Sequence, residues 1–269
     1  MPIPALQTTQ IAGKAVAWRE AGDGDALVLL HGIGGSSESW EDQLNQLSER
    51  YRVIAWDMPG YGGSECFNSA SPNVDDYTSC LTALLDTLAI EKVHILGQSI
   101  AALIAARFCV RNPGRSKSYV FAHGLTGLGG IDEEARETAK RGRLEVFKAL
   151  GPKRFAREKG PAIMSPGVSE VAREKAVGIM ARVNPAGFRQ AVEMLSTANL
   201  FDDAASISAP SLVLCGADDP IAPEPVCRTV EAVIPNAQFC LISGVGHYSA
   251  TESPPLFNAV ISDFLSDVA

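Results

Sequence analysis

The sequence predicts an α/β protein: a doubly wound, mostly parallel sheet of about eight strands, covered by helices on both faces. Three observations support this class. Short apolar runs bounded by Gly, Pro or Asp recur along the chain, which is typical of buried parallel strands. Helix-length stretches separate these runs, and such alternation implies right-handed crossovers within one sheet. One long segment lacks strands, which indicates an insertion.

The apolar runs define the expected strands. An N-terminal β-hairpin is expected around Ala12 and Gly13, followed by single strands after each crossover. The strands are expected at 5–12, 14–20, 26–30, 52–56, 93–96, 118–121, 211–214 and 238–242. The helices are expected at 40–50, 74–90, 100–112, 224–234 and 253–267.

Residues 125–200 break this rhythm because they contain no convincing strand. We expect a helical cap inserted between the sixth and seventh strands, over the sheet edge where open α/β sheets bind ligands. The α/β core would then be residues 1–124 and 201–269, and the alternative is a separate small domain. The cap should consist of short helices broken at Gly142, Gly151-Pro152, Gly160-Pro161, Pro166-Gly167 and 184–187.

Composition excludes several classes of partner. The chain has 269 residues and a net charge of −8, so it lacks the basic surplus that neutralises phosphates, and we expect neither a nucleic-acid nor a membrane partner. Its start has no signal-peptide pattern and no apolar run reaches membrane-spanning length, which predicts a cytoplasmic protein. The six scattered cysteines form no CxxC pair and are expected to be reduced.

No feature predicts a cofactor or a metal. The glycine-rich segment 124–130 does not open a helix after a strand in the way that a dinucleotide site requires, so a hinge of the cap is expected there. No His, Cys, Asp or Glu cluster has the spacing of metal ligands. The expected partner is a small-molecule substrate, and a homodimer is left open.

The main evidence for chemistry is the segment 93–102, VHILGQSIAA. A strand runs directly into Ser99 and an apolar helix follows, which is the pattern of a sharp turn that exposes a serine Oγ. Gly97 provides the small residue needed before the serine, while Ala101 stands where Gly is usual after it. The alternative is a buried Ser99 that caps the next helix.

Four further segments resemble motifs of the α/β-hydrolase family, and the resemblance covers nearly the whole chain. These motifs are the HGxxG loop, the D-x-P-G-x-G-x-S segment, the G-x-x-D-x-x-x-P stretch and the G-x-G-H turn. They correspond to residues 31–35 (HGIGG), 57–64 (DMPGYGGS), 216–223 (GADDPIAP) and 244–247 (GVGH). The resemblance implies an α/β-hydrolase fold, and the general pattern looks most like small bacterial 3-oxoadipate enol-lactonases and carbon–carbon bond hydrolases.

The same resemblance implies a catalytic triad. Ser99 would be the nucleophile, His247 its general base and Asp219 the acid that orients the base. The physical requirement agrees, since a serine hydroxyl needs an adjacent base and histidine titrates near neutral pH. Asp218 remains the alternative acid, although the spacing to Pro223 favours Asp219.

The loops around the triad are expected to supply the remaining groups. The oxyanion hole would consist of the backbone N–H groups of Ile33 and Ile100, which stabilise a tetrahedral intermediate. Gly32 and His123 are expected to line the substrate pocket. Arginines of the cap are further candidates for binding a substrate carboxylate, although most should lie in solvent.

The predicted function is a serine hydrolase that cleaves a carboxylic ester or lactone through an acyl-enzyme on Ser99. Three alternatives stay open, because a fold does not dictate its reaction. The same triad could cleave a carbon–carbon bond of a dienoic diketone acid. His247 and Asp219 could act as a base pair in a cofactor-free oxygenase or lyase. The pocket could also belong to a ligand receptor with slow turnover.

Overall fold

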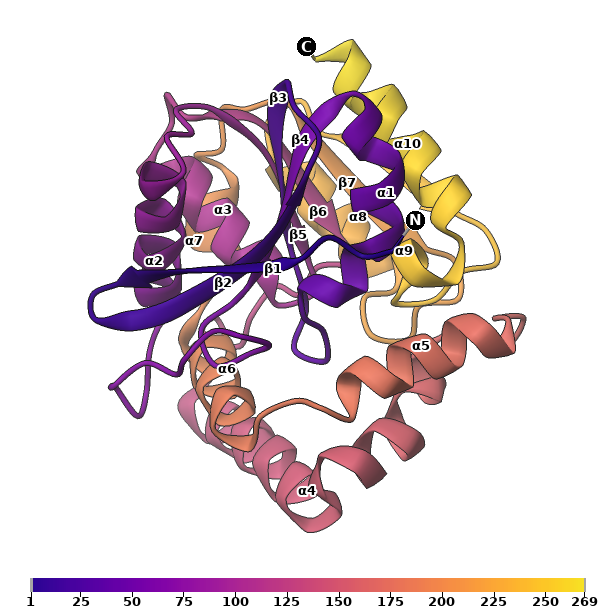
Figure 1. Ribbon diagram of the computed structural model, residues 1–269. Coiled ribbons are helices and arrows are strands. Elements are labelled where there is room, and N and C mark those ends of the chain that lie inside the picture. Colours follow the sequence, from indigo (N-terminus) through magenta and orange to yellow (C-terminus); the bar gives the residue numbers. More distant parts are fainter. Residues whose placement is uncertain (1, 269) are drawn as a thin grey trace.

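The computed structural model describes residues 2–268, and within this range the strands form one eight-stranded sheet (Figure 1). Its strand order is β1-β2-β4-β3-β5-β6-β7-β8. The first pairings, β1 with β2 and β2 with β4, are antiparallel, and the others are parallel. The strands are β1 Leu6–Ile11, β2 Lys14–Ala21, β3 Asp25–Leu30, β4 Tyr51–Asp57, β5 Val93–Gln98, β6 Ser116–Ala122, β7 Ser211–Gly216 and β8 Gln238–Ile242. The predicted mostly parallel sheet is confirmed.

Helices cover both faces of the sheet. In Figure 1, α2 and α3 lie on one side, and α1 and α10 lie on the other. The core helices are α1 Glu41–Gln46, α2 Val74–Thr87, α3 Ala101–Arg111, α7 Phe201–Ala204, α8 Glu224–Val233, α9 Ser249–Glu252 and α10 Pro254–Asp267. Short 3₁₀ helices span Ser37–Trp40, Leu47–Glu49 and Pro161–Ile163. The expected helix at 40–50 is therefore α1 flanked by 3₁₀ turns.

The strand residues divide between two hydrophobic cores. Along β3, Val28 and Leu30 pack in one core while Leu27 and Leu29 pack in the other, because successive side chains of a strand point to opposite faces. Every residue of β5 is buried, as expected for a central strand with helices on both sides. This double burial explains why the strands appear in the sequence as continuous apolar runs.

The cap lies between β6 and β7, below the sheet in Figure 1, and contains α4 Glu133–Lys159, α5 Glu170–Met180 and α6 Pro185–Thr197. The expected break at Gly142 was wrong, because α4 continues through it. A glycine inside a helix costs only about 1 kcal/mol relative to Ala, which a long packed helix can tolerate. The break at Gly151 is confirmed: its φ of 67° separates two helical segments of α4.

Aromatic stacking holds the cap together. The ring of Phe147 stacks on Phe188 of α6 with a centroid separation of 3.8 Å, and Phe155 meets both rings edge-on. Phe147 and Phe155 come from the two segments of α4, so this cluster fixes the angle between them. Phe147 and Phe188 also belong to the larger core of the sheet, which ties the cap to the rest of the molecule.

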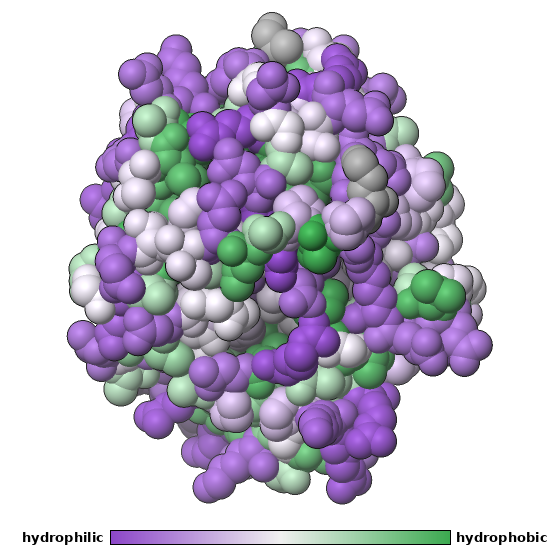
Figure 2. Space-filling model, viewed as in Figure 1, coloured by the Kyte–Doolittle hydropathy of each residue, from purple (hydrophilic) through white to green (hydrophobic). Residues whose placement is uncertain are grey.

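The surface has a mixed character. No helix within residues 2–268 is both long enough and apolar enough to cross a membrane. Figure 2 shows green hydrophobic residues in small groups among purple hydrophilic ones on the face it displays. Among residues 2–268, the most exposed large apolar side chain is Val171, at 78% exposure. Scattered apolar residues of this kind are normal on a protein surface.

Candidate active site

The carboxyl ends of four neighbouring strands bring four polar residues together. Ser99 directly follows β5, and His123 directly follows β6. Asp219 lies in the loop after β7, and His247 lies in the loop after β8. Parallel strands end at one edge of a sheet, so residues far apart in sequence meet there.

Ser99 occupies a strained turn. Its φ of 57° is unusual for a residue with a side chain and is held by two hydrogen bonds of 3.0 Å, from its N–H to Ala122 O and from Leu125 N–H to its carbonyl. The strand and the next helix approach so closely that a Cβ on Gly97 would come within 2.4 Å of Ala101 O. Glycine is therefore required before the serine, whereas alanine is accommodated after it.

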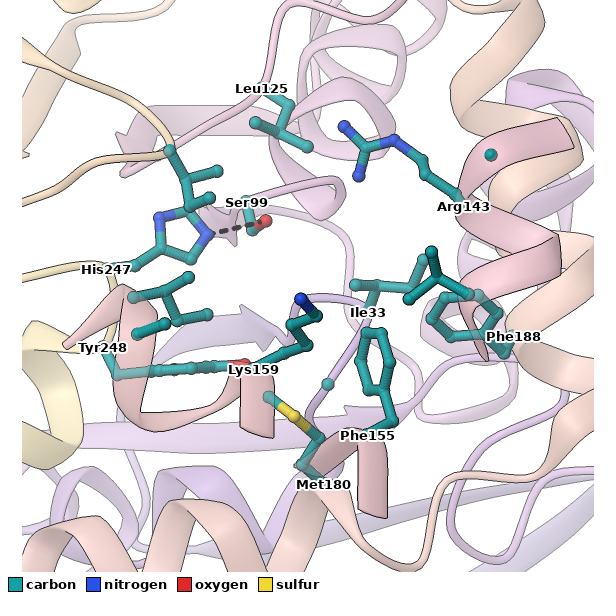
Figure 3. A pocket seen from close by; sticks show the side chains of 17 residues that line it. Ile33, Ser99, Leu125, Arg143, Phe155, Lys159, Met180, Phe188, His247 and Tyr248 are labelled. Atoms are coloured by element: carbon teal, nitrogen blue, oxygen red, sulfur yellow. Dashed lines mark hydrogen bonds between the residues drawn. The ribbon is translucent and has the colours of Figure 1, made fainter. Parts of the chain in front are cut away.

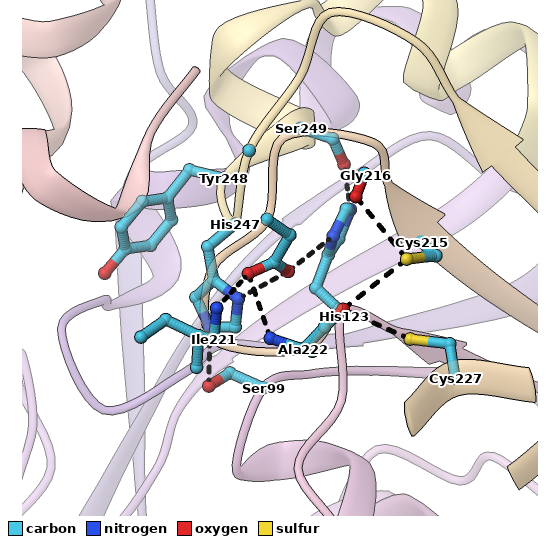
Figure 4. Close-up of polar contacts among 12 residues, drawn as sticks. Ser99, His123, Cys215, Gly216, Ile221, Ala222, Cys227, His247, Tyr248 and Ser249 are labelled. Carbon is cyan, nitrogen blue, oxygen red and sulfur yellow. Dashed lines mark hydrogen bonds and ion pairs between the residues drawn. The ribbon is translucent and has the colours of Figure 1, made fainter. Parts of the chain in front are cut away.

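The three predicted triad residues form a hydrogen-bonded chain (Figure 4). Ser99 Oγ lies 3.0 Å from His247 Nε2, and His247 Nδ1 lies 2.9 Å from Asp219 Oδ2. Because a carboxylate can only accept, Nδ1 carries the hydrogen and Nε2 accepts from the serine hydroxyl. Ser99 therefore bonds to histidine, and no side-chain cap is found at the start of α3.

Asp219 is held as a buried carboxylate. Burial alone would raise its pKa, but hydrogen bonds from His123 and His247 outweigh that effect and hold the pKa well below its usual range. Its other oxygen, Oδ1, accepts from the N–H groups of Ile221 at 2.8 Å and Ala222 at 3.0 Å. Four donors thus fix both the charge and the orientation of this side chain.

The geometry separates Asp219 from its alternative, Asp218. The carboxylate of Asp218 accepts a hydrogen bond of 2.9 Å from Ser165 Oγ in the cap. Only Asp219 contacts His247, so Asp219 occupies the position of the acid. The two adjacent aspartates of this loop therefore have different contacts: Asp218 binds the cap, and Asp219 binds the histidine.

The structure corrects the expectation that His123 lines the pocket. Its ring is fully buried, with Nδ1 lying 3.2 Å from Asp219 Oδ2 and Nε2 lying 2.5 Å from Ser249 Oγ (Figure 4). Burial is the main cause of its lowered pKa. With a φ of 50° at this residue, the ring lies between Asp219 and Ser249 and does not line the pocket. Nothing in the sequence around Ser249 signalled this contact.

The loop after β3 lies against the nucleophile. A Cβ on Gly32 would come within 2.9 Å of Ser99 Cβ, so this backbone packs directly on the serine. His31 holds the loop, since its Nδ1 donates to Gly32 O at 2.8 Å and its Nε2 accepts from Met58 N–H at 3.1 Å. Within the described chain, the N–H groups of Ile33 and Ile100 are without an acceptor.

A pocket of about 400 Å³ opens in front of the serine (Figure 3). Ser99, His247 and the predicted Gly32 line it, and most of the remaining wall is apolar. The cap supplies much of that wall, including Phe155 and Phe188. A pocket of this size suits a small molecule. No three His, Cys, Asp or Glu side chains of residues 2–268 are grouped to hold a metal ion.

Hydrogen bonds tie the cap to the loop that carries the histidine. The His247 N–H donates to Ile163 O at 2.8 Å, and Ser165 N–H donates to Glu252 Oε2 at 2.8 Å. From the sheet side, Gln98 Nε2 donates to His247 O at 2.9 Å. These bonds hold the histidine backbone from two directions, and no local sequence pattern predicts them.

This sheet, with a serine–histidine–aspartate chain at its carboxyl edge, defines the α/β-hydrolase class. Residues 25–254 match the family model for the alpha/beta hydrolase fold. The chain therefore belongs to the α/β-hydrolase family, and its class is that of a hydrolase. The predicted family membership is confirmed.

Individual proteins resemble the chain along most of its length. An (E)-2-((N-methylformamido)methylene)succinate hydrolase from Acinetobacter baylyi is 28% identical over 221 residues, 80% of each protein. A thermophilic esterase from Thermogutta terrifontis superposes with a TM-score of 0.87 at 24% identity, covering 100% of this chain and 99% of the other. The enol-lactonase from Burkholderia xenovorans superposes with a TM-score of 0.79 at 22% identity, covering 97% of this chain and 100% of the other. The two structural matches bear on the fold alone.

Proposed function

We propose that this protein hydrolyses a carboxylic ester or lactone of a small molecule through an acyl-enzyme on Ser99. The observation that carries the proposal is the chain from Ser99 Oγ through His247 to Asp219, which opens onto a pocket of about 400 Å³. The resemblance to a hydrolase of a succinate derivative supports hydrolysis as the class of reaction.

In the acylation step, His247 Nε2 removes the proton of Ser99 as Oγ attacks the substrate carbonyl carbon. Asp219 keeps the imidazole in the required tautomer and stabilises the imidazolium that forms. The N–H groups of Ile33 and Ile100 stabilise the oxyanion, a contribution of about 3 kcal/mol for each donor. The leaving alcohol takes the proton from His247.

In the deacylation step, a water molecule takes the place of the leaving group. His247 removes a proton from this water as it attacks the acyl-serine, and the second oxyanion occupies the same N–H groups. Collapse releases the carboxylic acid and returns the proton to Ser99. A lactone follows the same steps, with its alcohol and acid remaining in one product.

The test compares the wild type with Ser99→Ala on a panel of p-nitrophenyl esters and lactones. The proposal expects turnover of at least one substrate and a loss of at least about a thousandfold in the variant. Ser79→Ala, at a serine outside the pocket, is the control and should retain the wild-type rate. Equal activity of Ser99→Ala and wild type would remove Ser99 from the mechanism and favour base chemistry by His247 and Asp219.

A further inference from the structure

Two cations enter an otherwise apolar pocket. Arg143 and Lys159, both on α4, line the cavity in front of Ser99, and no Asp or Glu side chain is among the lining residues. Figure 3 shows the guanidinium of Arg143 and the ammonium of Lys159 directed into the pocket. The protein as a whole carries a net charge of −8, so a purely cationic lining differs from the average surface.

The kink in α4 explains how one helix presents both cations. Arg143 lies before Gly151 and Lys159 lies after it, at the end of the second segment. A straight helix would carry residues 16 positions apart to points about 24 Å apart along its axis. The change of direction at Gly151 instead lets both segments border one cavity of about 400 Å³.

Several neighbouring cations on the same helix have carboxylate partners. Lys140 pairs with Glu137 and Glu193, and Arg154 pairs with Glu158. Arg143 and Lys159 have no carboxylate within ion-pair distance among the described residues. Arg141, Lys148, Lys153 and Arg157 of α4 also lack one, but they do not line the pocket. Both side chains keep solvent-exposed surface while lining the pocket, and a cation there without a partner in the protein is matched best by an anion on the ligand.

We propose that the pocket selects an acyl group that carries a free carboxylate, which Arg143 and Lys159 bind while Ser99 attacks the ester or lactone carbonyl. The proposal rests on the hydrolase function proposed above and names its substrate class. Arg143 offers a planar pair of donors that fits both oxygens of a carboxylate, and Lys159 adds a mobile point charge. The apolar wall would contact the carbon chain between the carboxylate and the carbonyl that Ser99 attacks.

The kinetic test uses two esters of equal acyl length, mono-p-nitrophenyl glutarate and p-nitrophenyl pentanoate. The quantity measured is the ratio of kcat/KM for the charged ester to that for the neutral one. We expect a wild-type ratio above one and a fall of at least tenfold in the double variant Arg143→Gln/Lys159→Gln. Arg141→Gln and Lys153→Gln remove cations of α4 that do not line the pocket, and they should keep the wild-type ratio.

Salt provides a second readout of the same contact. Added NaCl screens a charge pair, so the ratio for the wild type should fall as ionic strength rises, while the ratio for the double variant should not change. The proposal is overturned if the double variant keeps the wild-type ratio, or if Arg141→Gln lowers the ratio equally.

A binding measurement separates this proposal from the hydrolase function. The Ser99→Ala protein is titrated by calorimetry with glutarate, with neutral glutaramide and with inorganic phosphate. Glutarate should bind more tightly than the other two and lose at least tenfold in affinity when Arg143→Gln is added. Stronger binding of phosphate or glutaramide would overturn the carboxylate preference. If the wild type hydrolyses no ester or lactone of the panel, the proposed hydrolase function fails, and this titration still decides whether the pocket binds a carboxylate.

Discussion

Two serine–histidine pairs meet at Asp219, and they differ in what they face. His247 and His123 each place Nδ1 next to Asp219 Oδ2, at 2.9 and 3.2 Å, and each places Nε2 next to a serine hydroxyl. Ser99, beside His247, lines the pocket. Ser249, beside His123, has no exposed surface and does not line it. A serine and a histidine thus appear twice around one shared carboxylate.

The comparison shows that a serine–histidine–aspartate chain is not enough to make an active site. Ser99 stands on a strained turn against the Gly32 backbone, with the Ile33 and Ile100 N–H groups available beside it. Ser249 begins a four-residue helix inside the core. Access and oxyanion donors therefore distinguish the reactive pair, while the buried pair is suited to holding Asp219 in place.

Removing the shared carboxylate should have the largest effect. Asp219→Asn leaves an amide that can donate toward His247 and favours the wrong tautomer, so kcat should fall by about 10⁴. Asp218→Asn is the matched control and should stay within a few-fold of wild type, because Asp218 contacts Ser165 and not a histidine. Ester kinetics with both variants measure the difference. Similar losses in the two variants would contradict the assignment of the acid.

Removing the buried histidine should have an intermediate effect. His123→Leu takes one donor from Asp219, so kcat should fall about tenfold with little change in KM. The hydrogen bond from His123 helps to lower the pKa of Asp219, so its loss should raise that pKa and move the acid limb of the kcat/KM profile to higher pH.

The conservative replacement His123→Asn supplies the control for that variant. Asn can place an amide donor near the position of Nδ1 and tolerates the φ of 50° at this residue. It should recover most of the lost kcat and the wild-type pH profile. If His123→Leu changes stability but leaves the pH profile and kcat untouched, His123 has a purely structural role.

Replacing the buried serine should affect stability more than activity. Ser249→Ala leaves His123 Nε2 buried without its partner, which costs about 1–3 kcal/mol of unfolding free energy. The Ser99–His247 pair is not touched, so kcat should remain within about threefold of wild type. Urea unfolding and ester kinetics measure the two quantities. A loss of activity comparable to that of Ser99→Ala would contradict the conclusion that only the Ser99–His247 pair is reactive.

The buried histidines should also give the protein a shallow acid sensitivity. Burial lowers the pKa of His123 in the folded state, and it lowers the pKa of His94 to about 4. Below pH about 6.5 the unfolded chain therefore binds protons that the folded chain does not, so the free energy of unfolding decreases as the pH is lowered. His94 alone should contribute a loss of about 1 kcal/mol by pH 5.5. Urea unfolding of wild type and His94→Gln at pH 7.5 and 5.5 should show a smaller pH effect in the variant, and identical effects would contradict the lowered pKa.

The sequence could predict the residues that depend on local patterns. Ser99 follows an apolar strand and precedes an apolar helix, and that pattern alone predicts the turn that the structure contains. The central strands, such as β5, were predictable because helices bury them on both faces. The four-residue helices α7 and α9 were missed, since they span little more than one helical turn and so show no repeated apolar pattern.

Other features depend on contacts that no local pattern records. His123 was visible as a residue after a strand, but the direction of its ring follows from a positive φ and from the distant Ser249. Gly142 and Gly151 look alike in the sequence, yet only Gly151 breaks α4. The sequence does not distinguish Arg143 from the other arginines of the cap, because its place at the pocket depends on the kink in α4.

The most direct test of the account is to label the wild-type protein with a fluorophosphonate and to locate the adduct by peptide mass spectrometry. The reagent phosphonylates an activated serine hydroxyl that can reach an oxyanion hole. The account predicts one adduct, on the peptide containing Ser99, and its loss in both Ser99→Ala and Asp219→Asn. An adduct on Ser249, or none on Ser99 under conditions in which the protein turns over an ester, would contradict it.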